Sequence, residues 1–465
     1  MAFKKTCLMI FAAVVLLSLH PGANAENTVE EKETQNKTSY TLNDLYALAL
    51  DRAESIKRAQ EDVFIAKKDR SRAFSVLVPR ITAFGSYTMS DSDQTTEPVI
   101  PGEFSDLSIQ NDSTAWGVRF EQSFTLNGKE LIALKMSKDN IDKSEMDLHA
   151  VKENYLIEVA TAYYNVLRAF KAWEIATANV KRLEKHRESV SVRLKLEEVT
   201  KTDMYRAESE LSDSQAKLIE DKNRYILSKA ALRSLVDIPA EFKLNEPAEK
   251  PFENETFDIY NLKQDGLEKR SEIKSAELAR LVSERKVKLA KGDRWPTLSI
   301  EGQYAESNDT NEGTADGTSM EYDQDVSGYQ IGAKLNFTLF DGGLRNAEIK
   351  QAFAKERQAK LAVAEIRKKI ELEIQDAYLT LLTQKSRLVS LNDKLTFSEQ
   401  NYRAVSEQFK HGLSNSVDMM DANTLLVAAE RELSDARYGY KLASLKLKKA
   451  TGTFLSETIK KEDKK

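Results

Sequence analysis

Residues 329–344, YQIGAKLNFTLFDGGL, decide how the chain folds. Apolar side chains, with one alanine, recur at every second position from Tyr329 to Leu339, and polar residues or glycine occupy most positions between them. A period of two is typical of a strand with one apolar and one polar face. The period stops at Gly342 and Gly343, because glycine adopts backbone angles outside both strand and helix, and a charged helical pattern follows. The stretch predicts a two-faced strand that leads directly into a very long helix.

The same unit occurs once before, at residues 116–130 (WGVRFEQSFTLNGKE), where Phe-Thr-Leu again precedes a long helical pattern. Pro79 aligns with Pro296, and Asp203 aligns with Asp418, at a nearly constant offset. A repeat of this length indicates a tandem duplication of one structural unit.

The expected unit is helix, strand, loop, strand, long helix and return helix, and the first helix of each half is predicted to run unbroken, over about 42–76 and 258–291. The full prediction is a first half at 26–239 (strands 79–90 and 114–125, long helix 128–197, return helix 200–236), a linker at 240–257, a second half at 258–453 (strands 296–306 and 328–340, long helix 344–411, return helix 415–451) and a charged tail at 454–465.

The long helix of the second half carries a seven-residue repeat. Its core positions alternate steps of four and three from Ile370 to Phe409, and only Gln384 and Ser398 are polar. The return helix keeps the same spacing from Leu433 to Leu447. The two helices are therefore predicted to pack as an antiparallel supercoiled hairpin.

The composition favours long solvated helices over one compact globule, since 31% of the 465 residues are charged and only 17 are glycine. Residues 1–25 are typical of a secretory signal, because Lys4 and Lys5 precede an apolar run and a small-residue site ends at Ala25. The single cysteine, Cys7, lies inside this segment, so we expect a mature chain without disulfides. A formal net charge of −5 argues against nucleic acid as a partner.

The strands allow two interpretations. Alternation alone fits a small soluble sheet packed on helices. The secretory signal and the aromatic residues on the apolar faces, Tyr87, Trp116, Tyr304 and Tyr329, favour strands in an outer membrane, in contact with lipid. A barrel in lipid must close, and the smallest such barrels have about eight strands, so four strands per chain require several copies to share one barrel.

Three segments carry a family resemblance: FTLFDGG at 337–343, HGLSNSVDMMDAN at 411–423 and LSDARYGYKLASLKLKKATGTF at 433–454. With the duplicated layout, they resemble the TolC-type outer-membrane efflux channel family (outer membrane factor). The resemblance implies a mainly α fold with membrane β, in which tandem-duplicated helical hairpins form a periplasmic α-barrel. In a homotrimer, the four strands of each chain would contribute to a shared 12-stranded outer-membrane β-barrel.

The implied function is a passive exit duct for a tripartite efflux or type I secretion system in a Gram-negative bacterium. The implied partners are a periplasmic adaptor (membrane fusion) protein and an inner-membrane transporter. The resemblance does not distinguish drug efflux from protein secretion, because the pump is expected to select the transported substrate.

The resemblance also assigns site residues. VDMMDA at 417–422 matches the motif that places acidic rings in the tunnel entrance, so Asp418 and Asp421, with Asp203 in the first half, are expected to form the periplasmic gate. The adaptor-docking tips are expected at Thr200, Lys201, Gly412, Leu413 and Ser414. From the residues alone, helix capping and the helix dipole explain the acidic residues equally well.

Two departures from the family pattern concern the same end of the molecule. Where relatives hold a latching tyrosine and arginine, this chain has Phe409 and Ser414, so its closed state is expected to use other bonds. Where Gly412 precedes the second tip, the first half has Glu197 and Glu198, which leaves the shape of the first tip open.

Two rival functions were weighed. An enzyme is disfavoured because the mature histidines, His149, His186 and His411, lie far apart and match ordinary surface residues, and no nucleophile motif or glycine-rich phosphate loop is present; no metal or cofactor is expected. The second rival is a non-conducting outer-membrane anchored periplasmic coiled-coil structural protein, which only a conductance measurement distinguishes from a duct.

Overall fold

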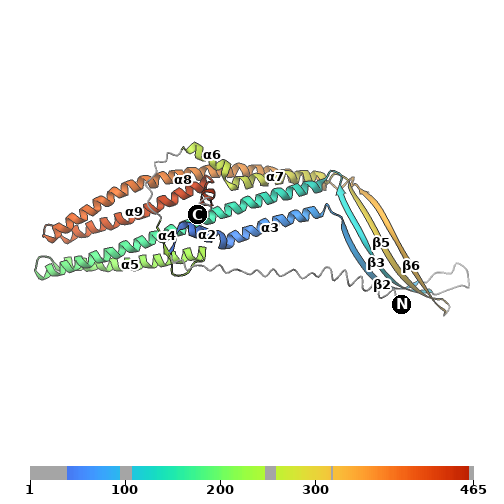
Figure 1. Cartoon of the computed structure of the whole chain (residues 1–465), viewed down its shortest axis with the longest axis horizontal. Helices are drawn as coiled ribbons and strands as arrows, with labels where there is room; N and C mark the ends of the chain where they lie inside the picture. Colours follow the sequence, from blue (N-terminus) through green and yellow to red (C-terminus); the bar gives the residue numbers. More distant parts are fainter. Residues whose placement is uncertain (1–38, 95–106, 247–257, 316–317, 460–465) are drawn as a thin grey trace.

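The computed structural model describes residues 39–94, 107–246, 258–315 and 318–459. The molecule is elongated, with helical hairpins at one end and a sheet at the other (Figure 1). The expected signal at 1–25, most of the linker at 240–257 and the end of the tail lie outside the described residues.

The order of elements repeats once along the chain, which confirms the predicted duplication. Helices α4 and α8 are each 67 residues long, about 100 Å at the α-helical rise. The first half comprises α2 (Leu42–Arg52), α3 (Glu54–Ser75), β2 (Arg80–Gln94), β3 (Leu107–Thr125), α4 (Lys129–Lys195) and α5 (Lys201–Val236). The second comprises α6 (Ile259–Lys269), α7 (Ser271–Gly292), β5 (Thr297–Ala315), β6 (Thr318–Asn336), α8 (Leu344–Lys410) and α9 (Ser416–Ala450). A short parallel pair, β1 (Ser39–Tyr40) with β4 (Lys243–Leu244), and α10 (Phe454–Ile459) complete the chain.

The first helix of each half is broken, so the prediction of unbroken helices was wrong. Ala53 separates α2 from α3 and Arg270 separates α6 from α7, both with φ of −60° and extended ψ angles of 122° and 127°. Neither break has a proline. Both residues are buried, and the Arg270 guanidinium donates to the carbonyl oxygen of Ala450 at 3.3 Å, so tertiary contacts set the break.

The strands are longer than predicted, and residues 337–340, predicted as strand, lie beyond the end of β6. Strands β5 and β6 pair without interruption up to Ala315 opposite Thr318, through a segment whose composition predicted a loop. Polar side chains support this pairing, because Thr310 Oγ1 donates to Asp323 Oδ1 at 2.8 Å across the two strands. A polar composition predicts a loop because loops are exposed to solvent. The strands of a solvent-exposed hairpin have the same polar composition, so composition alone does not distinguish the two.

The sheet has the order β2-β3-β5-β6, with every pair antiparallel. Its register places one apolar residue opposite another across the strands, as in the row Ala83, Val118, Tyr304 and Tyr329. The adjacent row, Thr82, Arg119, Gln303 and Gln330, belongs to the opposite face, where Arg119 Nε donates to Gln303 Oε1 at 3.1 Å. The predicted division into an apolar and a polar face is confirmed.

The hairpin cores follow the seven-residue repeat. In α8 the buried residues at predicted core positions are Ile370, Ile374, Ala377, Leu381, Leu388, Leu391, Ser398 and Phe409. The six from Ile370 to Leu391 pack against Leu433, Ala436, Ala443 and Leu447 of α9 in two clusters, and Phe409 packs with Met419 of α9 in a third, which confirms the predicted antiparallel hairpin.

The chain end corrects one further prediction. Residues 454–465 were expected to form a charged tail, but Phe454 and Leu455 are buried in the central core with Tyr163 and Tyr438. Two apolar residues at the start of a lysine-rich segment are enough to dock a short helix.

Candidate functional site at the hairpin tips

The two hairpin tips lie together at the end of the molecule farthest from the sheet (Figure 1). One tip joins α4 to α5 and the other joins α8 to α9. Arg193 Nη2, near the end of α4, donates to the carbonyl oxygen of Lys410 at the end of α8, at 3.4 Å. The tips of the two halves are therefore in direct contact within one chain.

Both tips have the same backbone, which answers the question left open for the first. Glu197 has φ of 63° and Gly412 has φ of 74°, both left-handed. In each tip the next amide donates back five residues, from Glu198 to Arg193 at 3.0 Å and from Leu413 to Gln408 at 2.9 Å. These are helix C-terminal motifs that usually use glycine, so Glu197 holds a conformation unfavourable for a residue with a Cβ.

The return helices begin with matching capping boxes. The Thr200 hydroxyl oxygen accepts from the Asp203 amide at 3.2 Å while Asp203 Oδ2 accepts from the Thr200 amide at 3.0 Å. In α9 the Asn415 side chain accepts from the Asp418 amide at 2.9 Å and Asp418 Oδ2 accepts from the Asn415 amide at 3.3 Å. Two of the three expected gate residues are therefore helix caps within the chain, as the alternative explanation required.

The expected gate carboxylates remain accessible. Asp418 and Asp421 are exposed, and they lie three residues apart in the first turns of α9. Hydrogen bonds from the Thr200 side chain and backbone hold the pKa of Asp203 below its usual range, so this carboxylate is ionised at neutral pH. Asp203 belongs to the other hairpin, at the equivalent position in α5.

The expected docking residues lie on the outer surface of the tips. Thr200, Lys201, Gly412 and Leu413 are exposed, and Ser414 is half-buried. Leu413 is 79% exposed, an apolar side chain presented to solvent at the extreme end of a hairpin. Ser414 Oγ donates to Asp418 Oδ2 at 3.2 Å, so Ser414 supports the cap.

His186 is buried, so its assignment to the surface was wrong. Its imidazole is 6% exposed, and its ring centroid lies 5.1 Å from that of Phe409. The Arg193 guanidinium lies 4.8 Å from the centroid of the Phe409 ring. Phe409, which stands where the resemblance implied a latching tyrosine, therefore joins the two hairpins through ring contacts. His149 and His411 are exposed as predicted.

Polar contacts that the sequence analysis missed join the hairpins behind the tips. Asn423 Nδ2 donates to Asn179 Oδ1 at 2.8 Å, and Arg182 donates to both carboxylate oxygens of Glu430, at 3.3 and 3.1 Å. A signal was present in the sequence, because Ser416, Asn423 and Glu430 are spaced by seven residues and form a polar stripe on α9.

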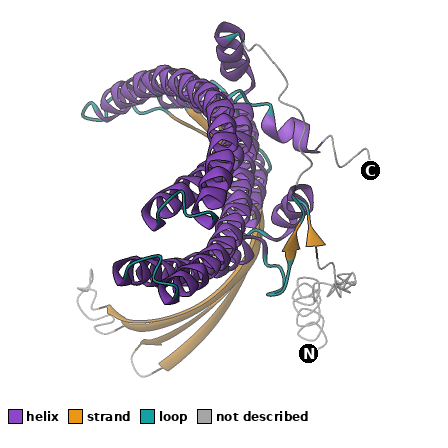
Figure 2. Cartoon of the chain, turned by 90° about the vertical axis from the view of Figure 1, so that its left-hand side faces the viewer, coloured by secondary structure: helices purple, strands orange, loops and turns teal. Residues whose placement is uncertain are grey.

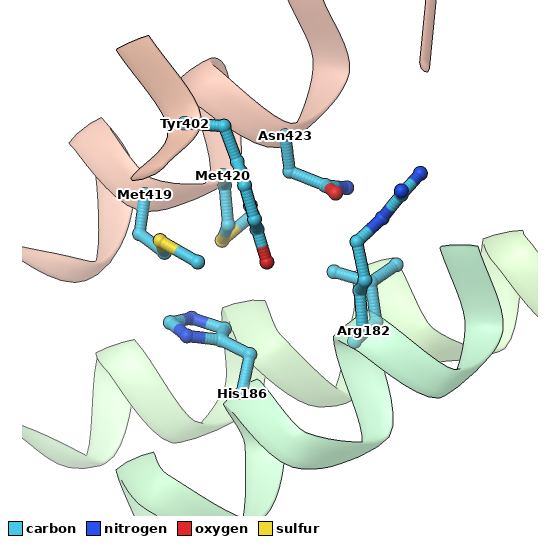
Figure 3. Close-up of a pocket in the computed structure, with 7 residues that line it drawn as sticks. Arg182, His186, Tyr402, Met419, Met420 and Asn423 are labelled. Carbon is cyan, nitrogen blue, oxygen red and sulfur yellow. The ribbon is translucent and has the colours of Figure 1, made fainter. Parts of the chain in front are cut away.

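A small cavity lies between α4 and the second hairpin, next to these contacts (Figure 3). It has no room for a water molecule. The side chains that line it are those of Arg182, Leu183, His186, Tyr402, Met419, Met420 and Asn423. Within the described ranges, no three or more His, Cys, Asp and Glu side chains form a group able to hold a metal ion. Over the same residues, no helix is both long and apolar enough to cross a membrane.

The comparison with protein families decides the class. The outer membrane efflux protein family matches residues 45–236 and, a second time, residues 262–453. The chain belongs to this family. Its members are transport channels of the Gram-negative outer membrane, so the chain is a non-enzymatic outer-membrane efflux channel of the TolC type.

Relatives match over most of this efflux protein's length. Outer membrane protein TolC of Vibrio cholerae is 22% identical over 460 residues, which cover 98% of this chain and 97% of the relative. The alkaline protease secretion protein AprF of Pseudomonas aeruginosa is 21% identical over 420 residues, which cover 88% of this chain and 83% of the relative. Among solved structures, the Campylobacter jejuni CmeC outer membrane channel matches with a TM-score of 0.75 at 18% identity, over 90% of this chain and 89% of that one.

Proposed function

We propose that three copies of this chain close into one tube that serves as a passive exit duct, with the strands in the outer membrane and the hairpins in the periplasm. The observation that carries the proposal is the open sheet. Within the described part of the chain, its outer strands, β2 and β6, each pair on one side only, and on β6 Tyr329 and Ile331 are 84% and 79% exposed. An exposed apolar sheet with two free edges has to be completed by other chains and covered by lipid.

The helices show the same incompleteness. Seen along the long axis, the helical layer is a curved arc rather than a closed bundle (Figure 2). Exposed apolar residues form two short stripes, each made of two residues one seven-residue step apart: Ile219 and Ile226 on α5, and Leu372 and Leu379 on α8. These stripes are additional to the buried core positions of each hairpin. They are suited to packing against the helices of a neighbouring copy.

The tips are the end that engages the periplasmic adaptor and, through it, the inner-membrane transporter. The residues proposed to dock the adaptor are Thr200, Lys201, Gly412, Leu413 and Ser414, at the end of the hairpins opposite the sheet (Figure 1). The exposed side chain of Leu413 supports this proposal, because interfaces rely on a few apolar anchors within a polar surround.

A photocrosslinker at Leu413 should capture the adaptor, and one at Asp309, on the sheet end of the molecule, should not. Capture of the adaptor at Asp309 and not at Leu413 would place the docking site at the sheet end and refute docking at the hairpin tips.

Asp418, Asp421 and Asp203 are proposed as the gate at the periplasmic mouth. Threefold symmetry would bring the α9 carboxylates of three chains around one axis, and a ring of negative charge favours cations. The variant with both Asp418→Asn and Asp421→Asn should lose cation preference in bilayer recordings, while Asp435→Asn, an acidic residue farther along the same helix, should retain it. Unchanged selectivity in the double variant would leave Asp418 with its capping role only.

A further inference from the structure

The imidazole of His186 joins the two hairpins just behind the tips. His186 lies on α4, and its Nε2 is 3.0 Å from Oγ of Ser416, the first residue of α9. Both residues are buried, with 6% and 2% of their surfaces exposed. The contact therefore connects the start of the helix that carries Asp418 and Asp421 to the first hairpin.

The surroundings of His186 oppose a positive charge on the ring. Burial lowers the pKa of His186, since the charged imidazolium loses its hydration. Ser416 is at the N-terminus of α9, where the helix dipole is positive and disfavours a cation. The apolar cluster beside the ring consists of Val190, Ala207, Phe409 and Met419.

Among the side chains that line the cavity, the single ionised one is Arg182 of α4, whose guanidinium donates to both carboxylate oxygens of Glu430 of α9 (Figure 3). Tyr402, from α8, lines the same cavity, and burial raises the pKa of its hydroxyl, so it stays neutral. Arg193 adds a second guanidinium, 4.8 Å from the centroid of the Phe409 ring. The carboxylate of Asp418 is held by the cap of α9.

Helix α5 contributes apolar groups and one paired acid. Met204 and Ala207 pack in the cluster beside Phe409, and Glu208 pairs with Arg187 at 3.4 Å. From all four helices, the groups close to the imidazole are neutral or basic, or are acids engaged with other partners.

We propose that His186 is an acid-sensitive tie between the two hairpins, and that a proton on its imidazole separates the start of α9 from α4 and loosens the mouth of the duct. This inference rests on the proposed function, because it names the regulation of the same gate. The neutral ring is compatible with the closed contact, and the charged ring is stable only when it reaches water.

The direction of the pH effect follows from linkage. The exposed ring has the ordinary pKa of about 6.5 and binds protons more readily than the buried ring, so the closed contact is fully stable above that value. It weakens as the pH falls below about 6.5. Because α9 begins at Ser416, displacement of its first turn moves Asp418 and Asp421 with it.

The test is the amide hydrogen-exchange protection of residues 412–423 in the purified full-length protein in detergent, corrected for the intrinsic effect of pH on exchange. Between about pH 7.5 and about pH 5, protection in the wild-type protein should fall by about threefold or more. His186→Gln should show no such fall, because glutamine cannot take up a proton in this range. His411→Gln, which removes an exposed histidine at the same end, should behave as the wild type does.

Equal protection at both pH values in the wild type would overturn the proposal, and so would a fall in His186→Gln as large as that of the wild type. His186→Phe, which keeps an aromatic ring against Phe409, provides a second variant if glutamine impairs assembly. Hydrogen exchange does not depend on conduction, so it tests the role of His186 independently of the duct function. If the chain does not form a duct, bilayer recordings show no current at any pH.

Discussion

Ala333 and Gly332 are adjacent on β6 but belong to opposite faces of the sheet, so they provide a matched pair for an arginine substitution. Ala333 shares its face with the exposed Tyr329, Ile331 and Leu335 and lies opposite Ile300. Gly332 lies opposite Glu301 on the polar face, and a Cβ there would meet no atom within 4 Å. Ala333 is exposed and the described residues leave open space at Gly332, so the difference between the two variants reports the environment of each face.

The expected cost follows from the depth of Ala333. It lies four residues from Tyr329, about 13 Å along β6, and three residues from the end of the strand at Asn336, about 10 Å in the other direction. With a strand tilt of about 40°, Tyr329 is about 10 Å away along the membrane normal and the end of β6 is about 8 Å away on the other side, which places Ala333 near the middle of an apolar band about 25 Å tall. Arginine on the lipid face at this depth costs about 2–4 kcal/mol per chain, and a barrel shared by three chains multiplies the cost.

The assay is urea unfolding of the assembled protein in lipid vesicles, with assembly yield as a second measurement. Ala333→Arg should lower the free energy of unfolding by about 2–4 kcal/mol per chain, and Gly332→Arg should leave it within about 1 kcal/mol of the wild type. Equal losses for the two variants, or a larger loss for Gly332→Arg, would refute the assignment of the apolar face to lipid.

Two further predictions concern the centre of the molecule. Arg270→Met should lower the free energy of unfolding in urea by about 3–5 kcal/mol, because the buried guanidinium pairs with Glu272 at 2.8 Å and with Glu373 at 3.1 Å. The control Lys269→Met, at the adjacent exposed residue, should cost under about 1 kcal/mol, and equal costs for the two variants would contradict a buried ion pair. Burial, and then the charge of Glu272, raise the pKa of Glu153 to about 7 from its ordinary 4.5, so the wild type loses stability as the pH rises through this range. Glu153→Gln should therefore be more stable than the wild type by about 3 kcal/mol at about pH 8 and equal to it near pH 4. Equal stability of the two proteins at both pH values would contradict the raised pKa of Glu153.

The elements that the sequence predicted correctly are those with a regular period. The apolar face of β6 and the seven-residue core of α8 each repeat over many residues, so local pattern and tertiary packing agree. The family resemblance rested on short segments at the second tip and in α9, and the family match covers both halves.

The elements that the sequence did not predict depend on contacts between distant residues. The break at Arg270 is set by bonds to Glu373 and to the carbonyl of Ala450, far along the chain. The burial of His186 likewise results from α9 packing across α4, and its neighbours on α4 are mostly charged. Glu197 shows the same limit, because a left-handed residue other than glycine at a tip has no local signal.

As a duct, copies of this chain together enclose a continuous aqueous path. The most direct test is the current across a planar lipid bilayer after addition of the purified oligomer at known salt concentration. A continuous aqueous path predicts discrete conductance steps with a preference for cations. Insertion of the protein into the bilayer without any current would contradict it and would identify the chain as a structural tether between the membrane and the periplasm.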